Sequence, residues 1–75
     1  MYIEFDLSRS AVPSIRSVLI RAAINDCNTK FTKPYRIKEV KGKEIEVHFD
    51  NDMDLYRFLF LFNVDYSFLK PRLCT

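Results

Sequence analysis

The residues of this chain that could do chemistry are few, and their spacing matches no common kind of active site. His48 is the single histidine, and nucleophilic catalysis would require a serine or cysteine beside it and a partner that orients its ring. No readable motif supplies either, so we interpret His48 as an ordinary strand histidine beside acidic residues. An enzyme would have to take its general acid and base from His48 and the carboxylates Glu4, Glu44 and Glu46. We expect no enzymatic activity.

The sequence also lacks the motifs that hold metals and phosphates. The acidic segment 50–54 is similar to the start of a calcium loop, but that loop needs glycine at its sixth position and glutamate at its twelfth. Leu55 and Leu61 occupy those positions. Cys27 and Cys74 have no metal-ligand spacing, and one glycine cannot build a glycine-rich phosphate loop. We therefore expect no metal and no cofactor.

Length and composition predict one folded domain over residues 1–75. Apolar residues make up 48% of the chain and aromatic residues 15%, which argues against disorder. The net charge of +2 gives no argument for strong electrostatic binding. The N-terminal residues contain two acids and no apolar run, so they predict no signal peptide, and no segment is long and apolar enough to span a membrane. We expect a reduced, intracellular, cytoplasmic protein.

In the first half of the chain, the apolar spacing predicts a strand, a helix and a polar loop. Residues 2–7 alternate between apolar and polar, as in a half-buried strand. A helix is expected from about residue 11 to 27. Its apolar side would consist of Val12, Ile15, Val18, Leu19, Ala22 and Ala23, with Ile20 and Ile24 on one flank. A polar loop is expected over residues 25–32.

In the second half, a hairpin, a second helix and a last strand are expected. Residues 35–49 alternate around Gly42, which can supply the positive φ that a tight turn needs. Acids and an asparagine can then cap a helix from about residue 52 to 62. One side of that helix would carry Leu55, Phe58, Leu59 and Phe62. Residues 64–69 alternate again and predict a short strand that Pro71 ends.

The order of these elements, β-α-β-β-α-β, predicts an α+β fold class. The expected architecture is a small two-layer sandwich, with an antiparallel sheet and two helices on one face, in the split βαβ order of ferredoxin-like folds. Such folds host many functions, RNA binding through sheet-face aromatic residues among them. Here the open face would present Glu4, Asp6, Glu44 and Glu46, whose charges repel phosphates. We expect no RNA binding on the sheet.

The segment 55–62, Leu-Tyr-Arg-Phe-Leu-Phe-Leu-Phe, leaves its helix almost no polar face. A surface helix normally buries one stripe and exposes the rest to water. Two explanations remain open. Either the segment is enclosed, as a buried strand or as a helix whose Tyr56 and Phe60 are covered by the C-terminal residues around Phe68, or the second side of the helix is exposed and binds a partner. The candidate contact residues are Met53, Tyr56, Arg57, Phe60 and Leu61, of types enriched at interface cores.

We therefore hypothesise a small non-enzymatic interaction module that binds another protein, or a second copy as a homodimer, through this helix. Regulators, adaptors and inhibitors, including small viral proteins, have this size. The alternative is a nucleic-acid-binding accessory protein that contacts phosphates. It would use Lys30, Lys33, Arg36, Lys38, Lys41 and Lys43. We prefer the first hypothesis because Arg36 and Lys38 are expected to lie across from Glu44 and Glu46, which would offset their charge.

Overall fold

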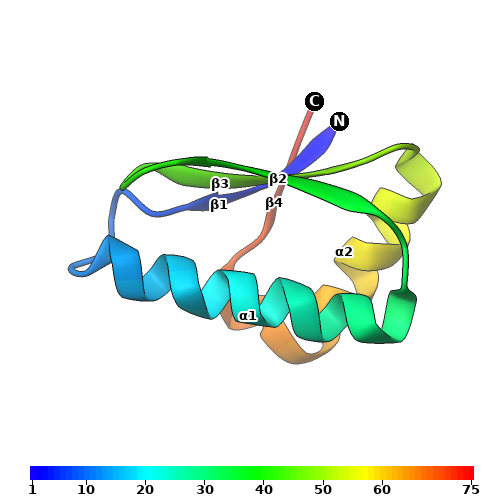
Figure 1. Ribbon diagram of the computed structural model, residues 1–75, viewed down its shortest axis with the longest axis horizontal. Coiled ribbons are helices and arrows are strands. Elements are labelled where there is room, and N and C mark those ends of the chain that lie inside the picture. Colours follow the sequence, from blue (N-terminus) through cyan, green and yellow to red (C-terminus); the bar gives the residue numbers. More distant parts are fainter.

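The computed structural model describes residues 1–75 and confirms the α+β class, with two helices and a four-stranded antiparallel sheet (Figure 1). The elements are β1 (Tyr2–Asp6), α1 (Pro13–Phe31), β2 (Tyr35–Val40), β3 (Glu44–Phe49), α2 (Asp52–Tyr66), a 3-10 turn η1 (Ser67–Leu69) and β4 (Arg72–Cys74). Both helices cover the same face of the sheet, and the other face is open.

The strands lie in the order β2-β3-β1-β4, and every neighbouring pair is antiparallel. Strand β3 therefore lies between β1 and β2, the two strands that α1 connects. In the same way, β1 lies between β3 and β4, the two strands that α2 connects. The sequence predicted the order of elements along the chain, and the structure adds their order in the sheet.

In the two central strands, β1 and β3, every second side chain points toward the helices. Ile3 and Phe5 of β1 are fully buried, and they lie opposite Val47 and Ile45 of β3, which are also fully buried. Phe62 of α2 packs on this layer, with its ring centroid 5.2 Å from that of Phe5. Because each such side chain contributes about 1.5–3 kcal/mol when buried, this contact between sheet and helix accounts for much of the folding free energy.

The hairpin forms as predicted. Tyr35 of β2 lies opposite Phe49 of β3, and the turn between the strands contains Gly42 with a φ of 75°. A Cβ at this glycine would meet no atom within 4 Å. Glycine is therefore favoured here by its backbone conformation and not by lack of space.

Helix α1 is longer than the sequence indicated. The helix was expected to end near residue 27 but continues to Phe31, so that residues 28–31, expected to lie in a polar loop, are helical. Thr32 then takes the left-handed conformation, with a φ of 53°, and its N–H donates to the carbonyl of Asn28. Pro34 disfavours helical backbone in the residue before it. The residues that end the helix, Thr32 and Pro34, therefore lie about one turn beyond the end that the sequence predicted.

Helix α1 is also rotated relative to the prediction. The residues that face the core are Ser17, Ile20, Ala23, Ile24, Cys27 and Phe31. Ile15, Val18 and Leu19, expected on the buried side, are between 56% and 66% exposed. Apolar residues surround the N-terminal half of this helix, so that half cannot define the buried side. Cys27, at the expected end of the helix, and Phe31, in the segment expected to be a loop, define the buried side instead.

The C-terminal quarter differs from the prediction as well. Residues 64–69, expected to be a strand, complete α2 and form η1. The last strand comes after Pro71 and pairs with β1, so that Cys74 lies opposite Tyr2. Leu69 of η1 is buried in the core. After η1, the chain therefore passes from the helical layer to the edge of the sheet within a few residues.

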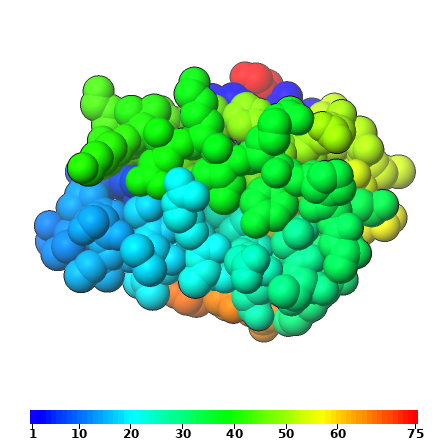
Figure 2. Space-filling model, viewed as in Figure 1, coloured from blue at the N-terminus to red at the C-terminus, as the bar shows by residue number.

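The two layers are in close contact along α1, where the side chains of β2 lie against those of the helix (Figure 2). Glu39 of β2 makes the polar part of this contact. Its carboxylate accepts hydrogen bonds from the Ser17 hydroxyl at 3.1 Å and from Nε of Arg21 at 2.9 Å. The bonds from Arg21 are the main reason why the pKa of Glu39 is lowered.

Candidate interaction surface

Helix α2 has a buried face and an exposed apolar face. Leu55, Phe58 and Phe62 face the core, and Leu59 is half-buried beside them, as the spacing predicted. On the opposite side, Met53 and Phe60 are each 72% exposed and Val64 is 66% exposed. Both faces of this helix are therefore apolar, and only one of them is used inside the molecule.

The start of α2 is fixed by the predicted cap. The Asn51 side chain accepts a hydrogen bond from the backbone N–H of Asp54 at 2.9 Å. Asp52 and Asp54 lie in the first turn, where negative charge is favourable beside the helix dipole. The cap sets where the helix begins, and helical geometry then sets which residues point away from the core.

The structure places four of the five candidate contact residues on the exposed side of α2: Met53, Tyr56, Arg57 and Phe60. The C-terminal residues do not cover Tyr56 and Phe60, which are 48% and 72% exposed. Leu61 lies elsewhere. It is half-buried against the core and lines a small cavity between the helices. That these residues bind a partner stays a prediction.

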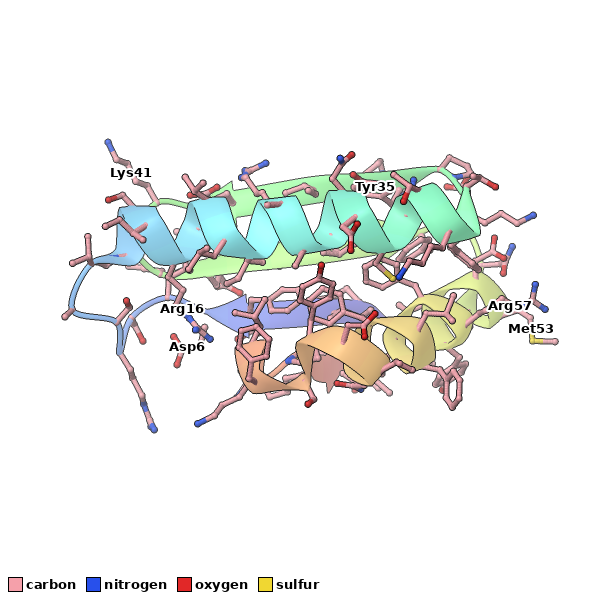
Figure 3. The ribbon with its side chains drawn as sticks, turned by 90° about the horizontal axis from the view of Figure 1, so that it is seen from below. Asp6, Arg16, Tyr35, Lys41, Met53 and Arg57 are labelled. Atoms are coloured by element: carbon pink, nitrogen blue, oxygen red, sulfur yellow. The ribbon has the colours of Figure 1, made fainter.

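The exposed residues of α2 follow a regular spacing. Met53, Arg57, Phe60 and Val64, which we call the outer strip, are four, three and four positions apart. This spacing is that of the seam along which two helices pack in a coiled coil. The strip runs the length of the helix, with Met53 and Arg57 near its start (Figure 3), and Arg57 is its one charged member.

A second exposed apolar group lies on α1 and η1, and the sequence did not reveal it. It consists of Ile15, Val18 and Leu19 of α1, together with Phe68 of η1, which is 68% exposed. Leu19 and Phe68 line a shallow groove between these two elements. The heptad-like spacing of Ile20, Ile24, Cys27 and Phe31 was the signal that could have identified the opposite side of α1 as exposed.

Polar contacts hold the two helices together between these groups. The Tyr66 hydroxyl donates a hydrogen bond to the Asp26 carboxylate, and this bond is the main cause of the raised pKa of Tyr66. Lys30 of α1 lies 3.4 Å from a carboxylate oxygen of Asp65 in α2. The outer surface of the helical layer is therefore held in one arrangement by contacts that cross from α1 to α2.

The open sheet face carries the carboxylates and the histidine that the sequence placed there. Nε2 of His48 lies 2.9 Å from Oε1 of Glu46, which lowers the pKa of Glu46. The His48 ring stacks on Tyr2 with 5.1 Å between ring centroids. Burial and the neighbouring carboxylates Glu4 and Glu46 raise the pKa of Glu44. No group of three or more His, Cys, Asp or Glu side chains is placed to hold a metal ion.

The residues of the basic stretch do not form one continuous surface. Arg36 lies across from His48, not from a glutamate as expected, and pairs with Asp50 at 2.8 Å. Lys38 lies across from Glu46, as predicted. Lys30 pairs with Asp65 on the helical side. The remaining three are divided between the two ends of β2, with Lys33 before the strand and Lys41 and Lys43 after it.

Comparison with known proteins gives no relative: no family model, curated protein or solved structure matches this chain. None of its helices combines the length and the apolar character that crossing a membrane requires. The class to which the molecule belongs is therefore defined by its architecture, a two-layer α+β sandwich with an apolar outer helical surface.

Proposed function

We propose that this protein is a small interaction module that associates with a second copy of itself through the outer strip of α2. The observation that carries the proposal is the strip itself, a seam of coiled-coil spacing that points away from the core. Large apolar side chains in such a seam gain free energy when a second helix removes them from water. Contiguous exposed apolar residues on a small domain are typical of an interaction site.

The strip is complementary to itself in antiparallel orientation. If two copies of α2 pack around an axis midway between Arg57 and Phe60, Met53 faces the Val64 of the other copy. In the same register, Arg57 faces the Phe60 of the other copy. A two-fold axis repeats each of these pairs, so one arrangement satisfies all four residues of the strip at once.

Arg57 supports this register in two ways. It has no ion-pair partner within its own chain, so its guanidinium is available for a contact with another molecule. A guanidinium over an aromatic face is worth about 0.5–2 kcal/mol, and the Phe60 ring of the other copy offers that face. A single polar residue in an apolar seam also selects one register over its neighbours.

The size of the helical face agrees with a dimer in which both helices take part. A stable interface buries about 800 Å² on each partner, more than one helix face provides. The molecule measures 33 × 23 × 16 Å along its principal axes, so the whole helical layer is of the required size. The exposed group on α1 and η1, with Leu19 and Phe68, would complete the contact around the outer strip.

The proposal is tested by measuring the mass in solution over a range of concentrations by light scattering. We expect the native chain to reach the mass of a dimer, and Phe60→Glu to remain a monomer with an unchanged circular dichroism spectrum. Lys41→Glu, which adds negative charge at the hairpin turn, is the control and should still dimerise. A native chain that stays monomeric up to millimolar concentration would refute self-association.

The same experiment at several salt concentrations separates this proposal from the nucleic-acid alternative. An apolar interface depends weakly on salt, whereas phosphate contacts weaken steeply as salt increases. Dimer formation that is insensitive to salt, together with no salt-dependent binding to a mixed-sequence oligonucleotide, is the result that we expect.

A further inference from the structure

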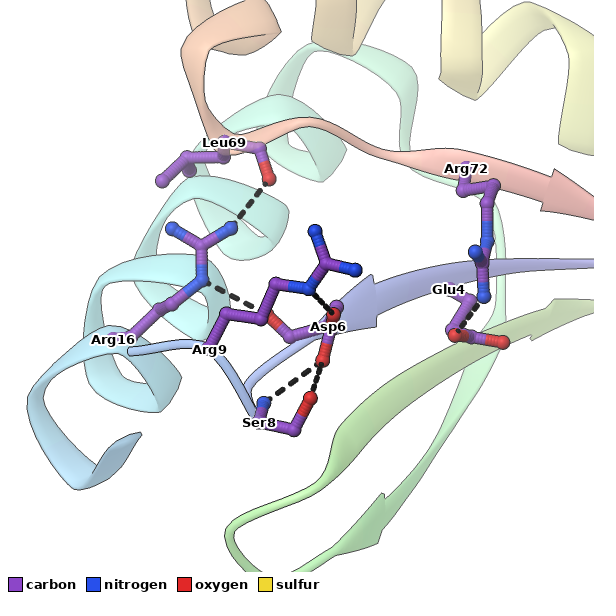
Figure 4. Close-up of polar contacts among 7 residues, drawn as sticks. All are labelled: Glu4, Asp6, Ser8, Arg9, Arg16, Leu69 and Arg72. Atoms are coloured by element: carbon purple, nitrogen blue, oxygen red, sulfur yellow. Dashed lines mark hydrogen bonds and ion pairs between the residues drawn. The ribbon is translucent and has the colours of Figure 1, made fainter. Parts of the chain in front are cut away.

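A polar cavity of about 390 Å³ lies where the loop after β1 meets η1. Its lining residues are Asp6, Arg9, Ser10, Arg16, Phe68 and Lys70. They come from two stretches that are distant in the sequence, residues 6–16 and residues 68–70. The end of β1, the first turn of α1 and η1 bring these stretches together, and Figure 4 shows Asp6, Arg9 and Arg16 of this group. Three of the six carry a positive charge, so the chemistry of this cavity is cationic.

Arg16 is held in place by neutral partners. Its Nε donates to the carbonyl oxygen of Asp6 and its Nη2 donates to that of Leu69, each at 3.0 Å. Both acceptors are backbone groups, and no carboxylate pairs with this guanidinium. Its charge is therefore not offset, its conformation is fixed, and it has N–H groups left for a ligand.

The only carboxylate of the cavity has partners of its own. Oδ1 of Asp6 accepts hydrogen bonds from the backbone N–H of Ser8 at 2.8 Å and from the Ser8 hydroxyl at 2.6 Å. These bonds lower the pKa of Asp6 and keep it ionised. Nε of Arg9 lies 4.0 Å from Oδ2 of Asp6. Because this one carboxylate offsets only one of the charges of Arg9, Arg16 and Lys70, the lining keeps two uncompensated positive charges.

We propose that this cavity binds a phosphate monoester that carries an aromatic ring. A phosphate dianion matches the two uncompensated charges, and guanidinium groups bind phosphate oxygens with paired N–H donors. The Ser10 hydroxyl adds a donor. Phe68 is exposed and forms a wall of both this cavity and the apolar groove with Leu19, so a ring attached to the phosphate would pack on it. The volume lies in the range of small-ligand sites.

This site lies outside the outer strip of α2, but Phe68 also belongs to the exposed group proposed to complete the dimer contact. Each measurement on the native chain is therefore repeated on the Phe60→Glu variant, which is expected to be monomeric. The probes are phenyl phosphate, inorganic phosphate and phenol, each added to the native chain at constant ionic strength and followed by NMR. We expect phenyl phosphate to shift signals of Ser10, Arg16 and Lys70. It should bind about tenfold more tightly than inorganic phosphate, a difference of about 1.4 kcal/mol, because its ring packs on that of Phe68.

Three variants assign the binding to the cavity. Arg16→Gln should abolish it. Because Arg16 also joins two backbone segments, the double variant Arg9→Gln/Lys70→Gln is the decisive one, since it removes two exposed charges and leaves these contacts intact. We expect it to weaken phenyl phosphate binding at least tenfold, whereas Lys33→Gln, a charge loss at a distant loop, should have no effect.

Three results would overturn the proposal. One is a set of shifts spread over Lys33, Lys41 and Lys43 instead of the cavity. Another is equal affinity of the native chain and the double variant. The third is phenol binding as tightly as phenyl phosphate, since this would mean that the apolar groove alone is the site.

Discussion

Phe58 and Phe60 lie two positions apart in α2 and have opposite surroundings. Phe58 is fully buried, with its ring centroid 5.1 Å from that of Phe49, whereas Phe60 is 72% exposed. Two positions in a helix correspond to a rotation of about 200°, which turns one ring toward the sheet and the other away from it. The same amino acid therefore has a structural role at one position and is available for association at the other.

Replacing each of these phenylalanines with alanine should separate the two roles. Phe58→Ala should lower the free energy of unfolding by about 3–5 kcal/mol, because it leaves a cavity in the core. Phe60→Ala should change it by no more than about 0.5 kcal/mol. Urea denaturation of dilute samples, where association does not contribute, measures both. Similar losses at the two positions would mean that the outer face is covered.

The rotation of α1 gives a second pair of substitutions. Ile24→Ala should cost about 2–5 kcal/mol, because Ile24 is fully buried. Val18→Ala should have an effect within about 0.5 kcal/mol, because Val18 is 66% exposed. Thermal or urea unfolding tests this directly. A large loss at Val18 with a small one at Ile24 would restore the rotation that the sequence first suggested.

The cap of α2 should contribute measurably to stability. Asn51→Ala removes the acceptor for the Asp54 N–H and should cost about 0.5–2 kcal/mol. Asn51→Ser keeps an acceptor at the same position and serves as the control, with a much smaller loss in urea unfolding. Equal losses for the two variants would show that the side-chain oxygen of Asn51 does not stabilise this helix.

Two glutamates should show opposite effects on stability. The pKa of Glu39 is lowered in the folded state from its ordinary value of 4.5. Its charge therefore stabilises the fold above that value, and the contribution is lost as the pH falls through the lower, folded pKa. Glu39→Gln should be destabilising near neutral pH, and its difference from the native chain should shrink in acid.

Glu44 is the matched residue, and its charge should affect the stability of the fold in the opposite direction. Burial and two nearby carboxylates raise its pKa above 4.5, so its ionised form is unfavourable in the folded state. Glu44→Gln should stabilise the protein near neutral pH, and this gain should disappear as Glu44 itself becomes protonated at lower pH. Urea midpoints of both variants over a pH series provide the test, and effects of the same sign would contradict these assignments.

Local signals in the sequence were sufficient for some elements and insufficient for others. Gly42 and Asn51 mark a turn and a helix start by their own chemistry, so the hairpin and the start of α2 were predictable. The rotation of α1 was missed, because Val18 and Ile24 are both apolar. The spacing that identifies the buried side appears only when the helix is continued to Phe31, through the segment expected to be a loop. The strand after Pro71 has three residues, and it forms because β1 offers an edge to pair with.

The candidate sites differ in the same way. The exposed side of α2 follows from counting large side chains such as Met53 and Phe60 in a small domain. The cationic cavity could not be predicted, because it depends on contacts such as that of Arg16 with Leu69, 53 positions away. Pairing of this kind is set by the topology of the sheet and not by any nearby motif.

The most direct test of the proposed two-fold packing is disulfide crosslinking between copies. The chains carry Cys74→Ser, because Cys74 is half-buried and is the one native cysteine that is not buried. Met53→Cys and Val64→Cys are prepared as separate variants and oxidised either alone or as an equal mixture. The antiparallel register predicts a crosslinked dimer in the mixture and little from either variant alone, because Met53 faces the Val64 of the other copy. Absence of a crosslink in the mixture, or equal crosslinking of Met53→Cys with itself, would contradict it.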